Sequence, residues 1–311
     1  MSQNTYRLER IGPHNVLDLI PLYKGVFGKT VTSEFLQAKY DTRYLGKAWY
    51  GHLAYDQKDR PVAYYGAVPF ALEIEGKRVI AAQSGDAMTL PGHNGQGLFT
   101  RLGEATDRLL EAEQLAFVYG FPNQNSHYGY TKKLHWQHEE LMQRYTIPVA
   151  TLPLEAVSRA LSFLRKPYEL WVNRCLPKAP ETELPNSVIE GTYGGTARDT
   201  AFFKYKFFLH SRLSRIGGKL VWLKAEGGLL IGDVEQCNSE EFSQFLKALR
   251  RKAFWLGIPK ITFQVSPGAP LDHLLKSHYP AYDSWAIGYK DYGSGLPLHR
   301  LRFTYGDLDT F

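Results

Sequence analysis

The stretch of sequence that decides the fold is VIAAQSGDAMTLPGHNGQGLFTRLGEATDRLLEA, residues 79–112. Residues 79–90 are typical of a strand, and Pro91–Gly97, which holds three glycines, interrupts it. Apolar residues then recur along one face of a helix, at Leu98, Leu102, Ala105 and Leu109. The segment therefore predicts a strand, a glycine-rich turn and a helix in direct succession.

A glycine-rich turn at the start of a helix can bind a phosphate. Glycines let the backbone approach a ligand, and the free N–H groups of the first turn favour an anion. A P-loop is excluded, because Gly97 is followed by Leu98 and Phe99 where Lys and Ser or Thr are required. The dinucleotide fingerprint also fails, since Thr100 stands at its third small position. Taken alone, the turn is equally compatible with an ordinary loop.

The rest of the first half predicts strands and helices around this segment. The hairpin turn Glu75–Lys77 joins two long strands. The expected strands are 5–8, 48–55, 61–74, 79–90, 115–119 and 141–147, and the expected helices begin at Pro13, Ser33 and Leu98 or cover 125–134.

The second half repeats a similar order of elements without a clear residue-by-residue repeat. Residues 153–172 predict an amphipathic helix interrupted at Pro167, and 176–185 has three prolines and the composition of a linker. The expected strands beyond it are 220–223, 229–234, 261–265, 284–289 and 301–305, and the expected helices are 240–256 and 270–278. We therefore predict a domain at 1–150, a helical and Pro-containing linker at 151–187, and a second domain at 188–311.

Composition and charge narrow the class of protein. The chain has 311 residues, of which 44% are hydrophobic and 22% charged, as in soluble globular proteins. Its net charge of +6 is spread without a long basic run, so a nucleic acid is not an expected partner. Cys175 and Cys237 form no metal-binding pattern, and we expect no metal. No leader and no apolar run near ~18 residues is found, which predicts a cytoplasmic protein without a membrane span.

Two motifs carry a resemblance to a known family. Gly92–Gly97 aligns with Arg/Gln-x-x-Gly-x-Gly/Ala, with the first position replaced, and Asn123, Ser126 and Tyr130 have the spacing Asn-x-x-Ser-x-x-x-Tyr. Over roughly residues 5–148 the chain resembles the GNAT superfamily of N-acetyltransferases. Leu134-His135-Trp136 departs from the usual Leu-Gly-Phe/Trp that follows. The resemblance implies an α+β fold with a mixed, mostly antiparallel sheet flanked by helices, followed here by a second, degenerate GNAT-like lobe.

The resemblance also implies a site for an acyl-CoA, acetyl-CoA in the first instance. The co-substrate would lie between the fourth and fifth strands, where the acyl carbonyl would accept an N–H near Met88 or Leu90. A small-molecule amine would attack directly, and Tyr130 would protonate the departing thiolate, since its pKa of about 10 is close to that of a thiol. Residues expected to contact the cofactor are Gly95, Gln96, Gly97, Leu98, Phe99, Thr100, Asn123 and Ser126.

Asp86 is the candidate general base. It is an acidic residue in the middle of an otherwise neutral strand, 84–88, where a lone charge calls for an explanation. The alternative is an ordinary solvent-facing position. His127 is a second candidate, although a surface histidine on a helix is the plainer interpretation.

The second half lacks a glycine turn, and its predicted helix starts after Glu235 with an acidic cap that would repel a diphosphate. We expect this half to contribute substrate contacts, with Asp307 or Asp309 in a cleft. The predicted activity is acyl-CoA-dependent N-acyl transfer, with an amino sugar or cell-surface precursor as a candidate acceptor. One alternative is a Fem-type aminoacyl transferase that uses tRNA, for which the basic segment 153–174 is the only candidate element. The other is a non-catalytic binding protein.

Overall fold

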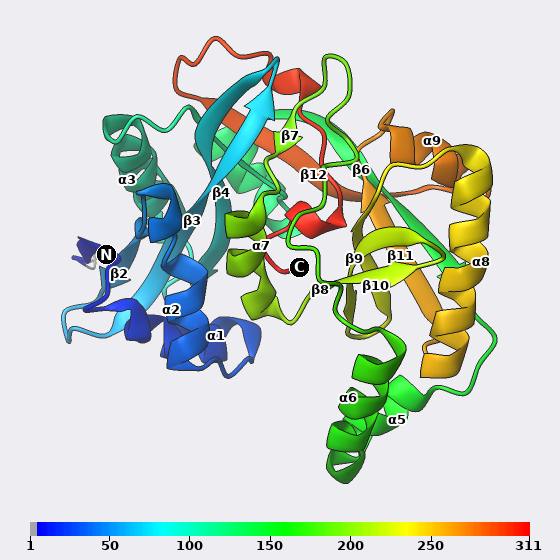
Figure 1. The fold of residues 1–311 in the computed structure, drawn as a ribbon. Helices are drawn as coiled ribbons and strands as arrows, with labels where there is room; N and C mark the ends of the chain where they lie inside the picture. Colours follow the sequence, from blue (N-terminus) through cyan, green and yellow to red (C-terminus); the bar gives the residue numbers. More distant parts are fainter. Residues whose placement is uncertain (1–4) are drawn as a thin grey trace. The chain divides into compact units, whose positions relative to one another are not determined.

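A computed structural model of the chain describes residues 5–311, which form two compact units. The first unit comprises residues up to Leu72, then Lys77–Glu139 and Ala286–His299. The second comprises Glu73–Gly76, Glu140–Trp285 and Arg300–Phe311. Figure 1 labels the elements of both. In the described residues, no helix is both long enough and apolar enough to cross a membrane.

The first unit is built on a sheet in the order β1-β2-β3-β4-β5-β12. β4 and β5 are parallel, whereas the pairs β1–β2, β2–β3 and β5–β12 are antiparallel. The strands are β1 (Arg7–Arg10), β2 (Tyr50–Tyr55), β3 (Pro61–Ile74), β4 (Lys77–Thr89), β5 (Phe117–Gly120) and, from Ala286 on, β12 (Tyr282–Asp291). The helices are α1 (Leu19–Phe27), α2 (Ser33–Tyr40), α3 (Leu98–Ala112) and α4 (Gln124–Tyr128), the last continued by a π-helical turn at Gly129–Lys133.

The core of the first unit lies between this sheet and α3. Leu98, Leu102 and Leu110 point from α3 into it and are buried against strand residues such as Val62 and Val118. Leu98 and Leu102 of the predicted stripe are buried, whereas Ala105 and Leu109 are only partly buried and Leu110 completes the buried face. These contacts fix α3 on the sheet, and with it the glycine turn that precedes α3.

The second unit has its sheet in the order β6-β11-β10-β9-β8, with β10 and β11 parallel and the other pairs antiparallel. Its strands are β6 (Gln137–Pro148, in this unit from Glu140), β8 (Arg212–Ile216), β9 (Lys219–Ala225), β10 (Leu229–Val234) and β11 (Lys260–Val265), with the short β7 (Gly195–Thr196). Its helices are α5 (Leu154–Ala160), α6 (Ser162–Cys175), α7 (Thr200–Lys206), α8 (Ser239–Leu256) and α9 (Pro270–Lys276). Short 3-10 turns in the two units are Val16–Asp18, Arg43–Leu45, Phe207–Leu209, Leu298–Arg300 and Tyr305–Asp307.

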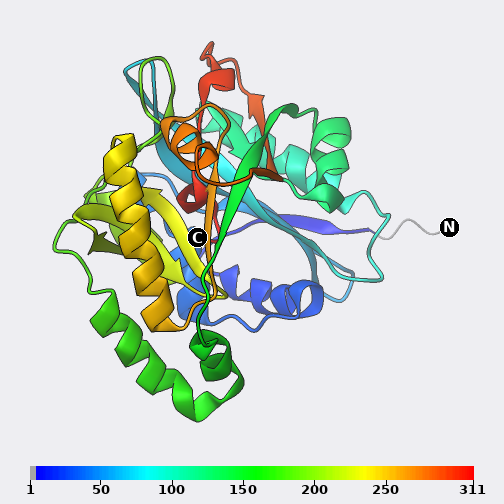
Figure 2. The same cartoon turned by 90° about the vertical axis from the view of Figure 1, so that its right-hand side faces the viewer.

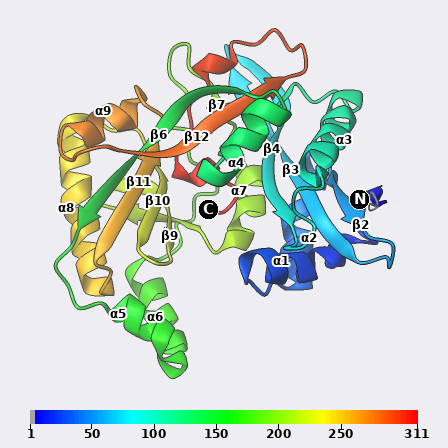
Figure 3. The ribbon, with the colours of Figure 1, turned by 180° about the vertical axis from the view of Figure 1, so that it is seen from behind.

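The two units share one order of elements: three successive strands, a long helix, a strand parallel to the third, and a short helix. The order is β2-β3-β4-α3-β5-α4 in the first unit and β8-β9-β10-α8-β11-α9 in the second. Each sheet also includes a strand from the other half of the chain, since β12 lies beside β5 in the first unit and β6 lies beside β11 in the second. Figure 2 shows β6 as a long green strand, and Figure 3 labels both β6 and β12. Because of this exchange, residues 140–150 belong to the second unit and residues 286–299 to the first. Neither segment follows the predicted division at residue 150.

The mixed, mostly antiparallel sheet with flanking helices is confirmed. Two details of the prediction are wrong. Residues 301–305 form only isolated bridges and part of a 3-10 turn. The break in the helical segment lies at Leu161 (φ −110°, ψ 100°), and α6 continues through Pro167. Pro167 has no N–H, so the carbonyl of Phe163 lacks its usual backbone hydrogen bond. Water can bind that carbonyl because this face of the helix is exposed.

Candidate functional site

The glycine turn leaves the start of α3 open. Gly92, Gly95 and Gly97 all have φ between 71° and 83°, the left-handed region that glycine enters without strain. Gly97 is the N-cap residue, no side chain caps the helix, and its first turn holds no acidic residue. Gly95, Gln96 and Gly97 are exposed. The turn therefore presents backbone N–H groups and the positive end of the helix dipole to solvent, which is the geometry that a diphosphate requires.

Aromatic packing holds this turn and the first turn of α3 in place. Leu98 is buried in the core, and the Phe99 ring meets Tyr130 edge-on with centroids 5.3 Å apart. At the other end of the turn, the Tyr6 hydroxyl lies 3.0 Å from Nδ1 of His93. The predicted cofactor-contacting residues Gly95–Thr100 thus form one continuous, anchored segment.

β4 carries an irregularity that changes which backbone groups face its neighbours. The carbonyl of Ile80 accepts from the N–H of Ala116, toward β5, whereas the N–H of Leu90 donates to the carbonyl of Val62, toward β3, both at 2.9 Å. Residues an even number apart on a regular strand face the same way, so one extra residue lies between them. Asp86, with φ 54°, marks this bulge.

The bulge corrects part of the predicted acyl site. Leu90 is not available to an acyl carbonyl, because its N–H is bonded to Val62. Met88, two residues before it on the same strand, faces the same side and is buried. The alternation places the N–H of Thr89 on the β5 side instead, and β5 ends at Gly120 while β4 continues. The sequence did not predict which N–H groups face β5, because no residue pattern indicated the bulge.

Asp86 is a largely buried carboxylate, with its side chain 10% exposed, and its Oδ2 takes three contacts. It pairs with Nζ of Lys39 at 2.5 Å and accepts the hydroxyls of Tyr23 at 2.6 Å and Tyr40 at 2.5 Å. Burial by itself raises the pKa of Asp86, but the Lys39 charge and the two hydroxyls outweigh it and hold the pKa below its usual value. The solvent-facing alternative is therefore wrong, and these contacts also make Asp86 a weak base.

The three partners of Asp86 come from α1 and α2, far away in the sequence. Lys39 is 3% exposed, although lysine is seldom buried without a partner. The sequence analysis did not identify Lys39, because its position between apolar residues on α2 was the only indication that it is buried. A residue held in the left-handed region costs about 1–3 kcal/mol, and the ion pair with Lys39 and the two tyrosine hydroxyls can offset this cost at Asp86.

Tyr130 is placed beside the open end of β4. It is buried, its hydroxyl lies 2.9 Å from Oγ of Ser84, and its ring packs against Trp136 with centroids 4.5 Å apart. Tyr130 belongs to the π-helical turn after α4, and such turns often occur at functional sites. Ser84 lies two residues before the Asp86 bulge, so the hydroxyl of Tyr130 is fixed near the point where β4 and β5 separate.

Asn123 and Ser126 have a local structural role. The Asn123 side chain accepts the N–H groups of Asn125 and Ser126, and the Ser126 hydroxyl accepts the N–H of Asn123. This reciprocal capping box starts α4 and so orients the segment that carries Tyr130. Contact of either side chain with a cofactor stays a prediction.

Residues 8–138 match the family model described as the acetyltransferase (GNAT) domain. These residues form a GNAT-type acetyltransferase domain. No protein with a curated description matches the sequence.

Solved structures share the fold over most of the chain. One is a probable N-acyltransferase from Enterococcus faecalis V583, with a TM-score of 0.59 and 14% identity, covering 93% of this chain and 73% of that one. A GCN5-related N-acetyltransferase from Kribbella flavida scores 0.58 at 14% identity, covering 93% and 72%. A glucosamine N-acetyltransferase region of a fungal multi-domain GH3 β-N-acetylglucosaminidase scores 0.54 at 11% identity, covering 93% and 38%.

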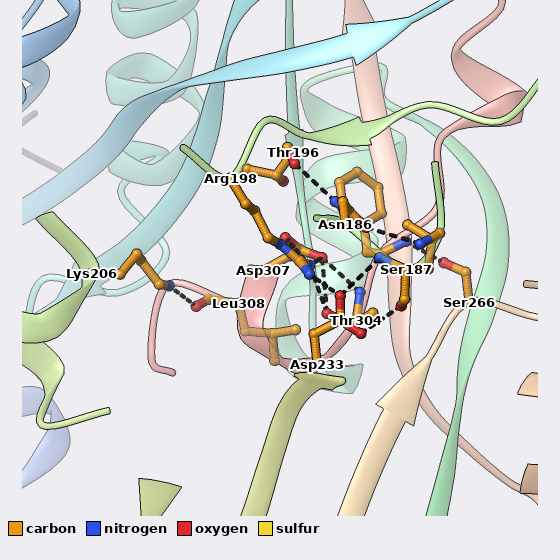
Figure 4. A network of polar contacts seen from close by, with 12 residues as sticks. Asn186, Ser187, Thr196, Arg198, Lys206, Asp233, Ser266, Thr304, Asp307 and Leu308 are labelled. Atoms are coloured by element: carbon orange, nitrogen blue, oxygen red, sulfur yellow. Dashed lines mark hydrogen bonds and ion pairs between the residues drawn. The ribbon is translucent and has the colours of Figure 1, made fainter. Parts of the chain in front are cut away.

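The second unit buries a cluster of charged side chains. Arg198 pairs with Asp233 and, at 2.8 Å, with Asp307, and all three side chains are fully buried (Figure 4). Ser187 donates its hydroxyl to Asp233 at 2.5 Å, and Thr304 donates its N–H to Asp307 at 2.7 Å. The expectation that Asp307 reaches a cleft is wrong, because the Arg198 guanidinium takes up this carboxylate within the protein interior.

Proposed function

We propose that the chain transfers an acetyl group from acetyl-CoA to a primary amine of a small acceptor, with an amino sugar as the first candidate. The observation that carries the proposal is the open start of α3, where glycines replace any capping side chain. A diphosphate fits there because exposed N–H groups and the helix dipole act on it together. The fungal glucosamine N-acetyltransferase region with the same fold is the reason for choosing an amino sugar.

Different chemical groups carry out the successive steps of the proposed reaction. Acetyl-CoA supplies the thioester, whose carbonyl carbon the neutral amine attacks. The N–H of Thr89 stabilises the developing oxyanion, as preorganised backbone donors do in acyl transfer. Tyr130 donates its hydroxyl proton to the sulfur as the C–S bond breaks, and Ser84, at 2.9 Å, keeps that hydroxyl in place. The attacking nitrogen forms the new C–N bond and loses its surplus proton to water.

Asp86 enters the proposal as a positioning residue. Its lowered pKa and the three donors to its Oδ2 suit a carboxylate that stays ionised, since a carboxylate with a lowered pKa is a poor proton acceptor. Its contribution is to hold the bulge that turns the N–H of Thr89 toward the open side of β4.

The test combines binding and transfer with the full chain. Acetyl-CoA at about 100 times its Kd should add about 2.7 kcal/mol to the stability of the native protein. Release of free CoA thiol should then occur with glucosamine and not with N-acetylglucosamine, which lacks the free amine. Tyr130→Phe should lower kcat by about 100-fold while the Kd for acetyl-CoA stays unchanged.

Each alternative has its own outcome. A chain that acetyl-CoA neither stabilises nor acylates, but that transfers an aminoacyl group from tRNA, would be a Fem-type enzyme. Stabilisation by acetyl-CoA without thiol release across a panel of amines would favour a binding protein. An unchanged kcat in Tyr130→Phe would remove Tyr130 from the mechanism.

A further inference from the structure

Exposed large apolar side chains gather on one face of the second unit. Of the fourteen such residues in the described part of the chain, nine lie in two short segments. We call these nine the hairpin face: Leu152, Leu154, Val157, Leu161, Phe163, Leu170, Trp171, Phe254 and Trp255. Phe163, Leu170 and Leu152 are 69–73% exposed, which is a costly way to place apolar surface in water unless something covers it.

The two segments of the hairpin face are fixed to each other. Nε1 of Trp171 donates to the carbonyl of Trp255, and Oγ1 of Thr151 donates to the carbonyl of Phe254. The hydroxyl of Tyr168 further joins α6 to the C-terminal end of α8. Figure 1 shows α5 and α6 as an adjoining helical pair near that end. These hydrogen bonds hold α6 and the segment before α5 against the C-terminal end of α8.

α6 has two adjoining apolar strips, one facing inward and one exposed. Leu164, Tyr168, Val172 and Cys175 face inward, and all are at least partly buried. On an adjoining strip of the helix, Phe163, Pro167, Leu170 and Trp171 follow each other at i, i+4, i+7 and i+8 and are all exposed. An apolar stripe at helical spacing on the outward side is typical of a helix that lies against a second surface.

The net charge around the hairpin face indicates what kind of surface it contacts. Residues 151–178 and 242–260 together carry ten basic and two acidic side chains, a net charge of +8. The whole chain carries +6, so the remainder is net −2. One of the two acids, Glu155, is buried and paired with Arg159. The exposed basic side chains next to the hairpin face are Arg159, Arg165, Lys166, Arg174, Arg250 and Arg251.

We propose that the hairpin face docks on the surface of an anionic lipid bilayer. Apolar and aromatic side chains that enter the headgroup region, rimmed by Lys and Arg that meet anionic headgroups, are the combination that an interfacial helix uses. A second copy of the chain is disfavoured because two surfaces of the same strong positive charge repel each other. An RNA would meet the charge but would leave the aliphatic leucines uncovered.

Co-sedimentation of the full chain with vesicles tests the proposal. The chain should pellet with vesicles that contain about one third anionic phospholipid and remain in the supernatant with pure phosphatidylcholine, and high salt should weaken the binding. The double variant Phe163→Ser/Leu170→Ser should lose at least tenfold in vesicle affinity, and so should Arg165→Gln/Lys166→Gln. Tyr282→Ser, which changes an apolar residue that is 54% exposed elsewhere in the second unit, should bind like the parent.

Several results would contradict the docking proposal, and each can be told apart from the others. Equal binding by the parent and by Phe163→Ser/Leu170→Ser would overturn the proposal. So would a dimer in sedimentation velocity that dissociates in that variant and does not bind vesicles. Binding of tRNA, lost in Arg165→Gln/Lys166→Gln without any vesicle binding, would assign the face to nucleic acid. Because the exposed substitutions leave the core intact, acetyl-CoA binding should persist in every variant, which separates this test from that of the proposed activity.

Discussion

The start of α3 and the start of α8 follow the same order of strands yet present opposite chemistry. α3 begins at Gly97 without a side-chain cap or an acid. α8 begins at Asn238, whose side chain accepts the N–H of Glu241 while the Glu241 carboxylate accepts the N–H of Asn238. Two further acidic groups, Glu235 and Glu240, stand beside that cap. A helix start binds an anion only if its N–H groups stay unused, and of these two helices only α3 leaves them so.

The strands that precede α3 and α8 resemble each other, which makes the contrast between the two helix starts informative. β4 is irregular at Asp86, and β10 shifts register between Ile231 and Asp233. Each irregular strand holds a buried aspartate paired with a cation, Lys39 in the first unit and Arg198 in the second. The same carboxylate-and-cation arrangement therefore accompanies both an open and a closed helix start. The anion site is decided by the turn that follows the strand.

The largest expected effect comes from removing the buried cations. Arg198→Met leaves Asp233 and Asp307 without their guanidinium and should cost about 3–5 kcal/mol of unfolding free energy. Lys39→Met leaves Asp86 with two tyrosine hydroxyls and should cost less. Urea unfolding measures both, and Arg215→Met, which removes a surface pair, should cost below about 1 kcal/mol.

Activity distinguishes the two cations further. Lys39→Met should also lower the rate of acetyl transfer, because it loosens the bulge at Asp86 that turns the N–H of Thr89. Arg198→Met should leave the rate per folded molecule unchanged. If Arg198→Met cost no more than the surface variant, the buried network would not be stabilising the second unit.

The next effect tests the helix starts directly. Gly97→Glu should weaken acetyl-CoA binding by about 100-fold, or about 2.7 kcal/mol, since it places a carboxylate where the diphosphate binds. Gly218→Glu is the matched control, because Gly218 also has a positive φ (80°) and open space around it. Both variants lose a similar amount of stability through backbone strain. Calorimetry that found equal affinity losses would refute the assignment of the diphosphate to α3.

Acid should weaken the first unit through His52. Burial, followed by the charges of Arg10 and Arg108, lowers the pKa of His52 to about 4, and its Nδ1 lies 3.0 Å from Oγ1 of Thr106. Between pH 6.5 and pH 4 the unfolded chain therefore binds a proton that the native protein does not, so stability falls as the pH falls through this window. The expected loss from pH 6.5 to 4.5 is about 1–2 kcal/mol, with allowance for partial exposure.

Replacement of the histidine isolates this contribution. His52→Gln keeps a polar group next to Thr106 and should flatten the loss of stability in that pH range. His273→Gln, an exposed substitution in the second unit, should not. Hydrogen exchange should show the acid effect first in amides of β2 and α3. An unchanged slope in His52→Gln would mean that another group titrates.

Local patterns predicted most of this fold. The strand boundaries 61–74 and 229–234 agree with β3 and β10, because hydrophobic runs bounded by turn residues are local signals. The glycine turn was found for the same reason. The exchange of β6 and β12 was not predictable, since strand pairing between distant segments has no signature in either segment.

The candidate site shows the same limit. Asp86 was singled out as a lone acid in a strand, yet its role depends on Lys39, Tyr23 and Tyr40, which only the tertiary fold brings to it. Asn123 and Ser126 were predicted as cofactor contacts from their spacing. The structure gives that spacing a second physical cause, because the capping box requires two residues three positions apart.

The smallest expected effect separates these two causes. Asn123→Ala and Asn238→Ala each remove the N-cap of one helix, α4 or α8, and each should cost about 1 kcal/mol of stability. If Asn123 also contacts the cofactor, only Asn123→Ala should weaken acetyl-CoA binding, by about tenfold. Asn238→Ala should not create a second binding site, because Glu240 and Glu241 remain at the start of α8 and repel a diphosphate. Two acetyl-CoA molecules bound per chain in that variant would show that the cap alone had closed the second unit, whereas unchanged affinity in Asn123→Ala would leave Asn123 a purely structural residue.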